Sequence, residues 1–97
     1  MKLGDRRATL VDVSLGGLSA RTKDYRGLQE GSRVTAVLTM MDEDVQLPLL
    51  VVRLEWEGDY MFVAGAFMGL SELKQAKLAQ FVRDWARKNI TQKRRFF

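Results

Sequence analysis

Apolar and polar residues alternate through much of the first 68 positions, which is the pattern of β-strands with one buried face. In residues 33–41 one set of alternate positions is apolar throughout: Val34, Ala36, Leu38 and Met40. The other set, Thr35, Val37, Thr39 and Met41, is partly apolar, so we expect this strand to be covered on both faces.

The same alternation predicts four further strands, at residues 6–13, 18–22, 45–55 and 60–68. Residues 23–32 form the one long loop, which Leu28 anchors to the core. Pro48 cannot donate to a strand ladder, so it predicts an edge or a bulge at that point. The acidic residues 42–44 fit a solvated hairpin turn better than a metal site, because adjacent carboxylates in a turn point apart.

A helix is expected from Ser71, an N-cap residue followed by Glu72 in the first turn, to about residue 90. Its apolar stripe, which we expect to lie across the open side of a barrel, is Leu78, Phe81, Val82, Trp85 and Ala86. Short strands with tight turns and one helix predict a mostly β fold: a small antiparallel barrel of five to six strands with a C-terminal α-helix. We assign one domain to residues 1–97, with the barrel at 6–70 and a basic tail at 91–97.

The most informative stretch is residues 10–18, where alternation ends in paired glycines. Gly16 and Gly17 are expected to reverse the chain, since glycine adopts positive φ without steric cost. A turn that pairs Ser14 with Gly17 sets the partners across the hairpin: Val13–Leu18, Asp12–Ser19, Val11–Ala20 and Leu10–Arg21. One face of this hairpin is then apolar, and the other carries Asp12, Ser14, Ser19 and Arg21.

Residues 12–17 read DVSLGG, which fits the D/N-x-S-x-x-G signature and resembles PilZ domains, bacterial receptors for cyclic di-GMP. The flanking residues 8–11 (ATLV) and Leu18 are similar to that family, as are residues 51–53 (VVR) and 63–71 (VAGAFMGLS). The resemblance therefore runs from about residue 6 to the C-terminal helix. It implies a PilZ-like fold and a cytoplasmic, non-enzymatic sensor or adaptor that changes its contact with a neighbouring domain or protein partner.

In such a domain Asp12, Ser14 and Gly17 would contact the ligand. A carboxylate accepts from the N1–H and amine of guanine, a serine hydroxyl donates or accepts beside it, and Gly17 lets a flat ligand approach. Arg21 and Arg7 are further candidates for a phosphate contact. The alternative interpretation is that Asp12 and Ser14 cap their own turn through local backbone bonds.

The family also has an R-x-x-x-R element upstream of the aspartate, and the eleven residues before Asp12 contain only the adjacent Arg6 and Arg7. We therefore expect cyclic di-GMP binding to be weak or lost. The alternative is a degenerate PilZ domain that serves as a protein-interaction or oligomerisation module.

Composition narrows the chemistry. The chain has no cysteine and no histidine, which argues against an enzyme, a metal site or a cofactor.

Positive charge is concentrated at the C-terminal end of the sequence. Residues 1–71 hold 8 Lys/Arg and 10 Asp/Glu (net −2), and residues 72–97 hold 8 Lys/Arg and 2 Asp/Glu (net +6). The basic tail with Phe96 and Phe97 allows a nucleic-acid interpretation, which we disfavour because no strand interleaves aromatic and basic residues. No apolar run approaches the length of a membrane span, so no membrane insertion is expected.

Overall fold

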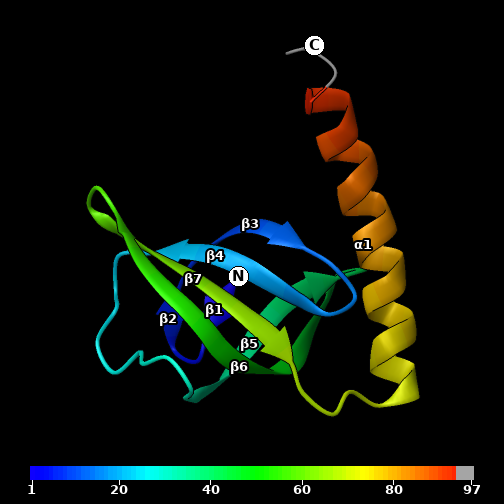
Figure 1. Cartoon of the computed structure of the whole chain (residues 1–97). Helices are drawn as coiled ribbons and strands as arrows, with labels where there is room; N and C mark the ends of the chain where they lie inside the picture. The colour runs from blue at the N-terminus through cyan, green and yellow to red at the C-terminus, as the bar shows by residue number, and fades with distance from the viewer. Residues whose placement is uncertain (94–97) are drawn as a thin grey trace.

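Seven antiparallel strands form one curled sheet, and a single helix packs against its open side (Figure 1). This computed structural model describes residues 1–93, with side chains as far as residue 88. The elements are β1 (Lys2–Leu3), β2 (Arg6–Arg7), β3 (Thr9–Val13), β4 (Gly17–Thr22), β5 (Arg33–Met40), β6 (Glu43–Glu57), β7 (Tyr60–Phe67) and α1 (Glu72–Lys93).

The two edges of the sheet are consecutive in the chain. The strand order is β2-β1-β5-β6-β7-β4-β3, so the edge strands β2 and β3 are separated only by Ala8. The Ala8 amide donates to the Met1 carbonyl at 3.1 Å, beyond the β1–β2 pairing. The predicted strand 6–13 is therefore two strands, and the chain crosses between the edges and curls the sheet into a half-barrel. The predicted mostly β fold with a C-terminal helix is confirmed, with seven strands instead of five or six.

The inner face of the sheet carries the core. Its most deeply buried side chains include Leu3, Ala20, Leu47, Leu49, Val51 and Val63. On β5 the predicted alternation is confirmed, because Ala36, Leu38 and Met40 are buried. The expected cover on the other face is wrong: Thr35 and Thr39 are exposed, and only Val37, opposite Lys2 of β1, is half-buried there.

Pro48 lies within β6 without interrupting it. Its carbonyl accepts from the Met68 amide at 3.0 Å, just past the end of β7. In a strand the N–H and C=O of one residue point to the same side, so the missing N–H faces the place where β7 has ended. The expectation of a local edge is thus met, but the bulge lies at Val52, between the pairs Val51–Gly65 and Arg53–Ala64.

The long loop is confirmed, but the turn predicted at residues 42–44 is displaced, because Glu43 and Asp44 already belong to β6 and pair with Met40 and Thr39. Met41 and Asp42 have positive φ (51° and 63°) and form the tight turn between β5 and β6. Within residues 1–93, no group of three or more acidic side chains is arranged to hold a metal ion. Leu28, in the loop between β4 and β5, is half-buried against the core.

The helix begins as predicted, since the Ser71 hydroxyl accepts from the Lys74 amide at 3.2 Å. Leu78 is buried, and Phe81, Val82 and Trp85 pack against the core. An ion pair of 2.9 Å from Lys77 to Glu43 joins α1 to the start of β6. The helix continues to Lys93, past its expected end, and the last four residues of the predicted basic tail lie outside the described residues. None of the described helical segments has the length and apolar character needed to cross a membrane.

Candidate functional site

The β3–β4 hairpin has the predicted register only at its turn. The Ser14 amide donates to the Gly17 carbonyl at 2.8 Å, and Val13 pairs with Leu18 and Asp12 with Ser19. A bulge between Leu10 and Asp12 then shifts the register by one residue. The expected pairs Val11–Ala20 and Leu10–Arg21 are therefore wrong, and the observed pairs are Leu10–Ala20 and Thr9–Arg21.

Gly17 is required for a reason that differs from the prediction. Neither Gly16 nor Gly17 is among the glycines with positive φ in residues 1–93. A Cβ on Gly17 would instead collide with the carbonyl oxygen of Gly65, so glycine allows β4 to approach β7 closely. At Gly16 the nearest atom to an added Cβ would be the Ser14 hydroxyl, 3.9 Å away. The two glycines therefore have different roles, and only Gly17 is fixed by packing.

Asp12 and Ser14 make the local hydrogen bonds of the alternative interpretation. The Asp12 carboxylate accepts from the Val13 amide at 2.9 Å through Oδ1. The Ser14 hydroxyl accepts from the Gly16 amide at 3.2 Å and donates to the Gly17 carbonyl at 3.4 Å. Both side chains are nevertheless exposed, and among the side chains described, those of residues 1–88, Oδ2 of Asp12 has no hydrogen-bond partner. Turn capping therefore leaves one carboxylate oxygen able to accept from a ligand.

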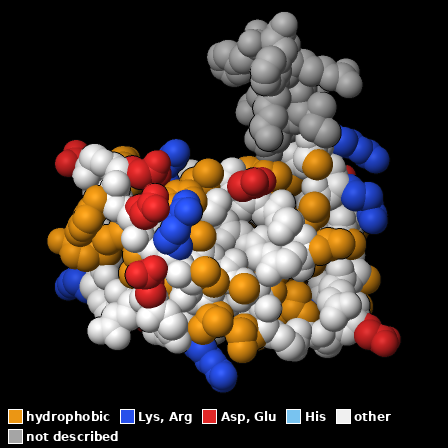
Figure 2. Space-filling model, viewed as in Figure 1, with side chains coloured by type: hydrophobic (Ala, Val, Ile, Leu, Met, Phe, Trp, Pro, Cys, Tyr) orange, Lys and Arg blue, Asp and Glu red, His pale blue; other side chains and the backbone are white. Residues whose placement is uncertain are grey.

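These residues border a hollow of about 370 Å³ on the outer face of the sheet. Its polar edge is Asp12, Ser14 and Ser19, and the rest is formed by small or apolar residues of β4, β6 and β7: Gly17, Val52, Ala64, Gly65 and Ala66. The hollow exists because small residues of β4 and β7 face one another, as in the pairs Gly17–Ala66 and Ser19–Ala64. In Figure 2 the middle of the view is mostly uncharged, with hydrophobic side chains scattered among backbone and other atoms, and most acidic side chains lie on the side of the β6–β7 hairpin. The surface suits a flat, partly apolar group that donates to a carboxylate.

The strands β6 and β7 contribute residues to this hollow that sequence reasoning did not single out. Small residues at the alternate positions Ala64 and Ala66 could have indicated a shallow surface on this part of the sheet. Val52 had no such signal, because its outward position depends on the bulge in β6.

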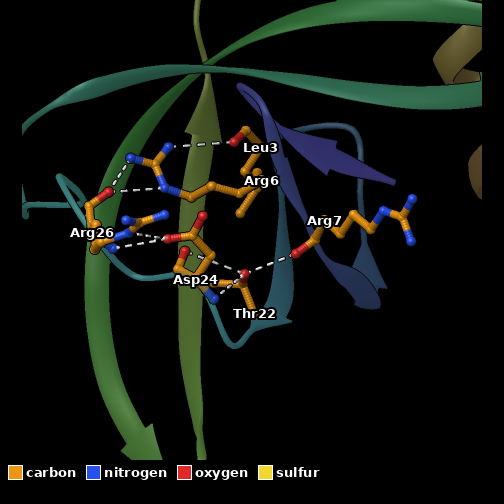
Figure 3. A network of polar contacts seen from close by, with 6 residues as sticks. All are labelled: Leu3, Arg6, Arg7, Thr22, Asp24 and Arg26. Atoms are coloured by element: carbon orange, nitrogen blue, oxygen red, sulfur yellow. Dashed lines mark hydrogen bonds and ion pairs between the residues drawn. The ribbon is translucent and has the colours of Figure 1, made fainter.

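The two candidate arginines lie in a different hollow from Asp12. Arg21 and Arg7 line a hollow of about 510 Å³ at the junction of β2, β3 and β4. The Arg21 guanidinium forms an ion pair with Glu57 at 3.1 Å. The Arg7 side chain points away from the neighbouring polar network (Figure 3). The structure thus brings Asp12, Ser14 and Gly17 together and places both arginines apart from them.

Arg6 holds the loop between β4 and β5. Its guanidinium donates to the carbonyl oxygens of Arg26 (3.0 Å through Nε) and Leu3 (3.4 Å), as Figure 3 shows. The Thr22 hydroxyl donates to the Arg7 carbonyl at 2.8 Å and accepts from the Asp24 amide at 3.1 Å. The side-chain hydrogen bond from Arg26 lowers the pKa of Asp24. Arg6 therefore has a structural role.

Comparison with protein-family models finds none that matches the chain, and comparison with curated proteins also finds no match.

Proposed function

We propose that this chain is a non-enzymatic, cytoplasmic, PilZ-like sensor or adaptor domain, in which the Asp12–Ser14 hollow is one side of a guanine dinucleotide site. The observation that carries the proposal is the hollow itself, where an exposed carboxylate stands beside a flat surface of glycine and alanine. A guanine could lie on that surface and donate its N1–H and amine to Oδ2 of Asp12. The sequence motif in residues 12–17 supplies the same residues.

The proposed site lacks a cationic cover. Arginine stacks on bases and forks onto phosphates, and no Lys or Arg lines the hollow. Each charge-assisted contact contributes about 1.5–3 kcal/mol, so a site without two of them loses at least about a hundredfold in affinity. We therefore expect the chain alone to bind cyclic di-GMP in the high micromolar range or more weakly.

A second observation favours the alternative, a protein-interaction module. A groove of about 600 Å³, lined by both apolar and polar residues, runs between the β3–β4 turn and the first half of α1. Leu15 lines the groove and is 63% exposed, and Leu73, in the first turn of the helix, is 66% exposed. Gly16 lines both this groove and the Asp12 hollow, so a change in the turn could affect both surfaces.

The test is a titration with cyclic di-GMP followed through backbone amide resonances. The proposal expects weak, saturable shifts at residues 12–19 and 64–66. Asp12→Ala should abolish them, and Asp59→Ala, which removes another exposed turn aspartate outside the hollow, should not. If the ligand leaves residues 12–19 unshifted at millimolar concentration, the interaction module is the better interpretation.

A further inference from the structure

The basic residues of the sheet are concentrated in one hollow. Residues 1–71 contain eight Lys/Arg, and four of them line the hollow at the junction of the sheet edges: Arg6, Arg7, Arg21 and Lys23. Two acidic residues, Asp5 and Asp24, line it as well. The hollow thus has a formal charge of +2 in a part of the chain whose net charge is −2. This concentration requires a physical explanation.

Most of these cations are not neutralised by the protein. Lys2 and Arg7 stand directly opposite each other in the β1–β2 pair, where like charges are destabilising. Within residues 1–93, Lys2, Arg7 and Lys23 form no ion pair, while Arg21 is paired with Glu57. The carboxylate of Asp24 is engaged by Arg26. Of the four cations that line the hollow, Arg7 and Lys23 are therefore left without an ion pair, whereas Arg6 is engaged by backbone carbonyls.

The arrangement offers donors from several strands. Thr9 pairs with Arg21 across β3 and β4, and Arg7 and Lys23 line the same hollow. The Lys23 ammonium lies 5.1 Å from the centre of the Tyr60 ring, and Tyr60 lines the same hollow. In proteins, hydroxyl, ammonium and guanidinium groups donate hydrogen bonds to phosphate oxygens.

We propose that this hollow is a binding site for a phosphate group, with Arg7 and Lys23 as its principal ligands and Arg21 and Thr9 beside them. An anion bound there would offset the charge of Arg7, which stands opposite the like-charged Lys2 in the β1–β2 pair. The site shares no lining residue with the Asp12 hollow, so it does not depend on the proposed dinucleotide function.

Inorganic pyrophosphate is a suitable probe, titrated at constant ionic strength while backbone amide resonances are followed. We expect saturable shifts at Arg7, Thr9 and Lys23, with residues 12–17 unshifted. The double variant Arg7→Gln/Lys23→Gln should weaken binding by about tenfold or more. The matched control Arg33→Gln/Lys88→Gln, which removes the same charge at exposed positions outside this hollow, should leave it unchanged.

A second arm separates a soluble phosphate compound from a lipid headgroup. Phosphatidylcholine vesicles containing phosphatidic acid should not co-sediment with the protein if the ligand is soluble. Co-sedimentation that the double variant abolishes would retain the phosphate site and assign it to a lipid. The proposal is overturned if pyrophosphate gives no saturable shift, if shifts spread equally over the basic residues of α1, or if both double variants weaken binding alike.

Discussion

The inner and outer faces of the same sheet are built on opposite principles. The inner face places Leu47, Leu49 and Val51 of β6 in the same core as Leu78 of the helix, and all four side chains are almost wholly buried. The outer face carries small and polar residues over β4 and β7, with a shallow hollow at the Asp12 turn and a basic hollow at the opposite end of the hairpin. Substitutions on the inner face should therefore change stability, and those on the outer face should change binding.

The largest expected effect tests the inner face. Leu78→Ala should lower the free energy of unfolding by about 2–5 kcal/mol, because a buried leucine leaves a cavity. Leu73→Ala, on the same helix but 66% exposed, should change it by less than about 0.5 kcal/mol. Chemical denaturation of both variants measures the difference. Equal effects would mean that α1 does not pack on the sheet as described.

The next prediction tests whether glycine is required at position 17 because of packing. Gly17→Ala should cost about 1–3 kcal/mol of stability, because its Cβ meets the Gly65 carbonyl. Gly16→Ala, one residue away in the same turn, should stay within about 0.5 kcal/mol, because its Cβ meets nothing closer than 3.9 Å. Thermal unfolding of the pair decides between this requirement and a general need for flexibility in the turn.

These contrasts show what the sequence could and could not predict. Alternation identified the buried positions of β5, and the Ser14–Gly17 turn fixed the pairs Val13–Leu18 and Asp12–Ser19. Bulges left no comparable signal, because one extra residue is accommodated by long-range pairing with β4 or β7. For the same reason residues 6–13 read as one strand, although their two halves belong to opposite edges of the sheet.

The candidate site was predictable to a similar extent. The motif indicated Asp12, Ser14 and Gly17, which do line one hollow. Its other walls come from β6 and β7, which begin more than twenty-five residues after Gly17, so their contribution depends on the tertiary fold. Arg7 and Arg21 lie apart from Asp12 because Arg7 belongs to β2 at the other edge of the sheet, and Arg21 lies two residues beyond Ser19, the partner of Asp12.

A substitution on the outer face should change ligand binding and leave stability nearly unchanged, the opposite of what we expect for Leu78→Ala. Asp12→Ala should weaken dinucleotide binding by about 1–3 kcal/mol by leaving guanine donors unpaired. It should change the unfolding free energy by less than about 1 kcal/mol, because the side chain is exposed and makes one local hydrogen bond. A titration with cyclic di-GMP measures the change in binding, and chemical denaturation of the same variant measures the change in stability. A loss of stability without a loss of binding would reduce Asp12 to a turn cap.

The smallest expected effect is on the stability of the protein at acid pH. The Arg26 hydrogen bond lowers the pKa of Asp24, so the carboxylate is favoured in the folded state. Its contribution to stability is present above the ordinary value of 3.8 and is lost as the pH falls through the lowered pKa. A carboxyl NMR titration should give a midpoint below 3.8, and Arg26→Gln should move that midpoint upward, whereas Arg33→Gln should not. A midpoint at or above 3.8 in the unsubstituted chain would contradict the contact.

The proposed role of Asp12 in a dinucleotide site is tested most directly by a calorimetric titration with cyclic di-GMP in which the cations absent from the Asp12 hollow are supplied. The chain is compared with a form extended at its N-terminus by a segment containing R-x-x-x-R, each with Asp12 and with Asp12→Ala. We expect weak or undetectable binding by the chain alone, a gain of at least about a hundredfold with the extension, and loss of that gain in Asp12→Ala. Sub-micromolar binding by the chain alone, or an extension that binds equally well without Asp12, would contradict this expectation.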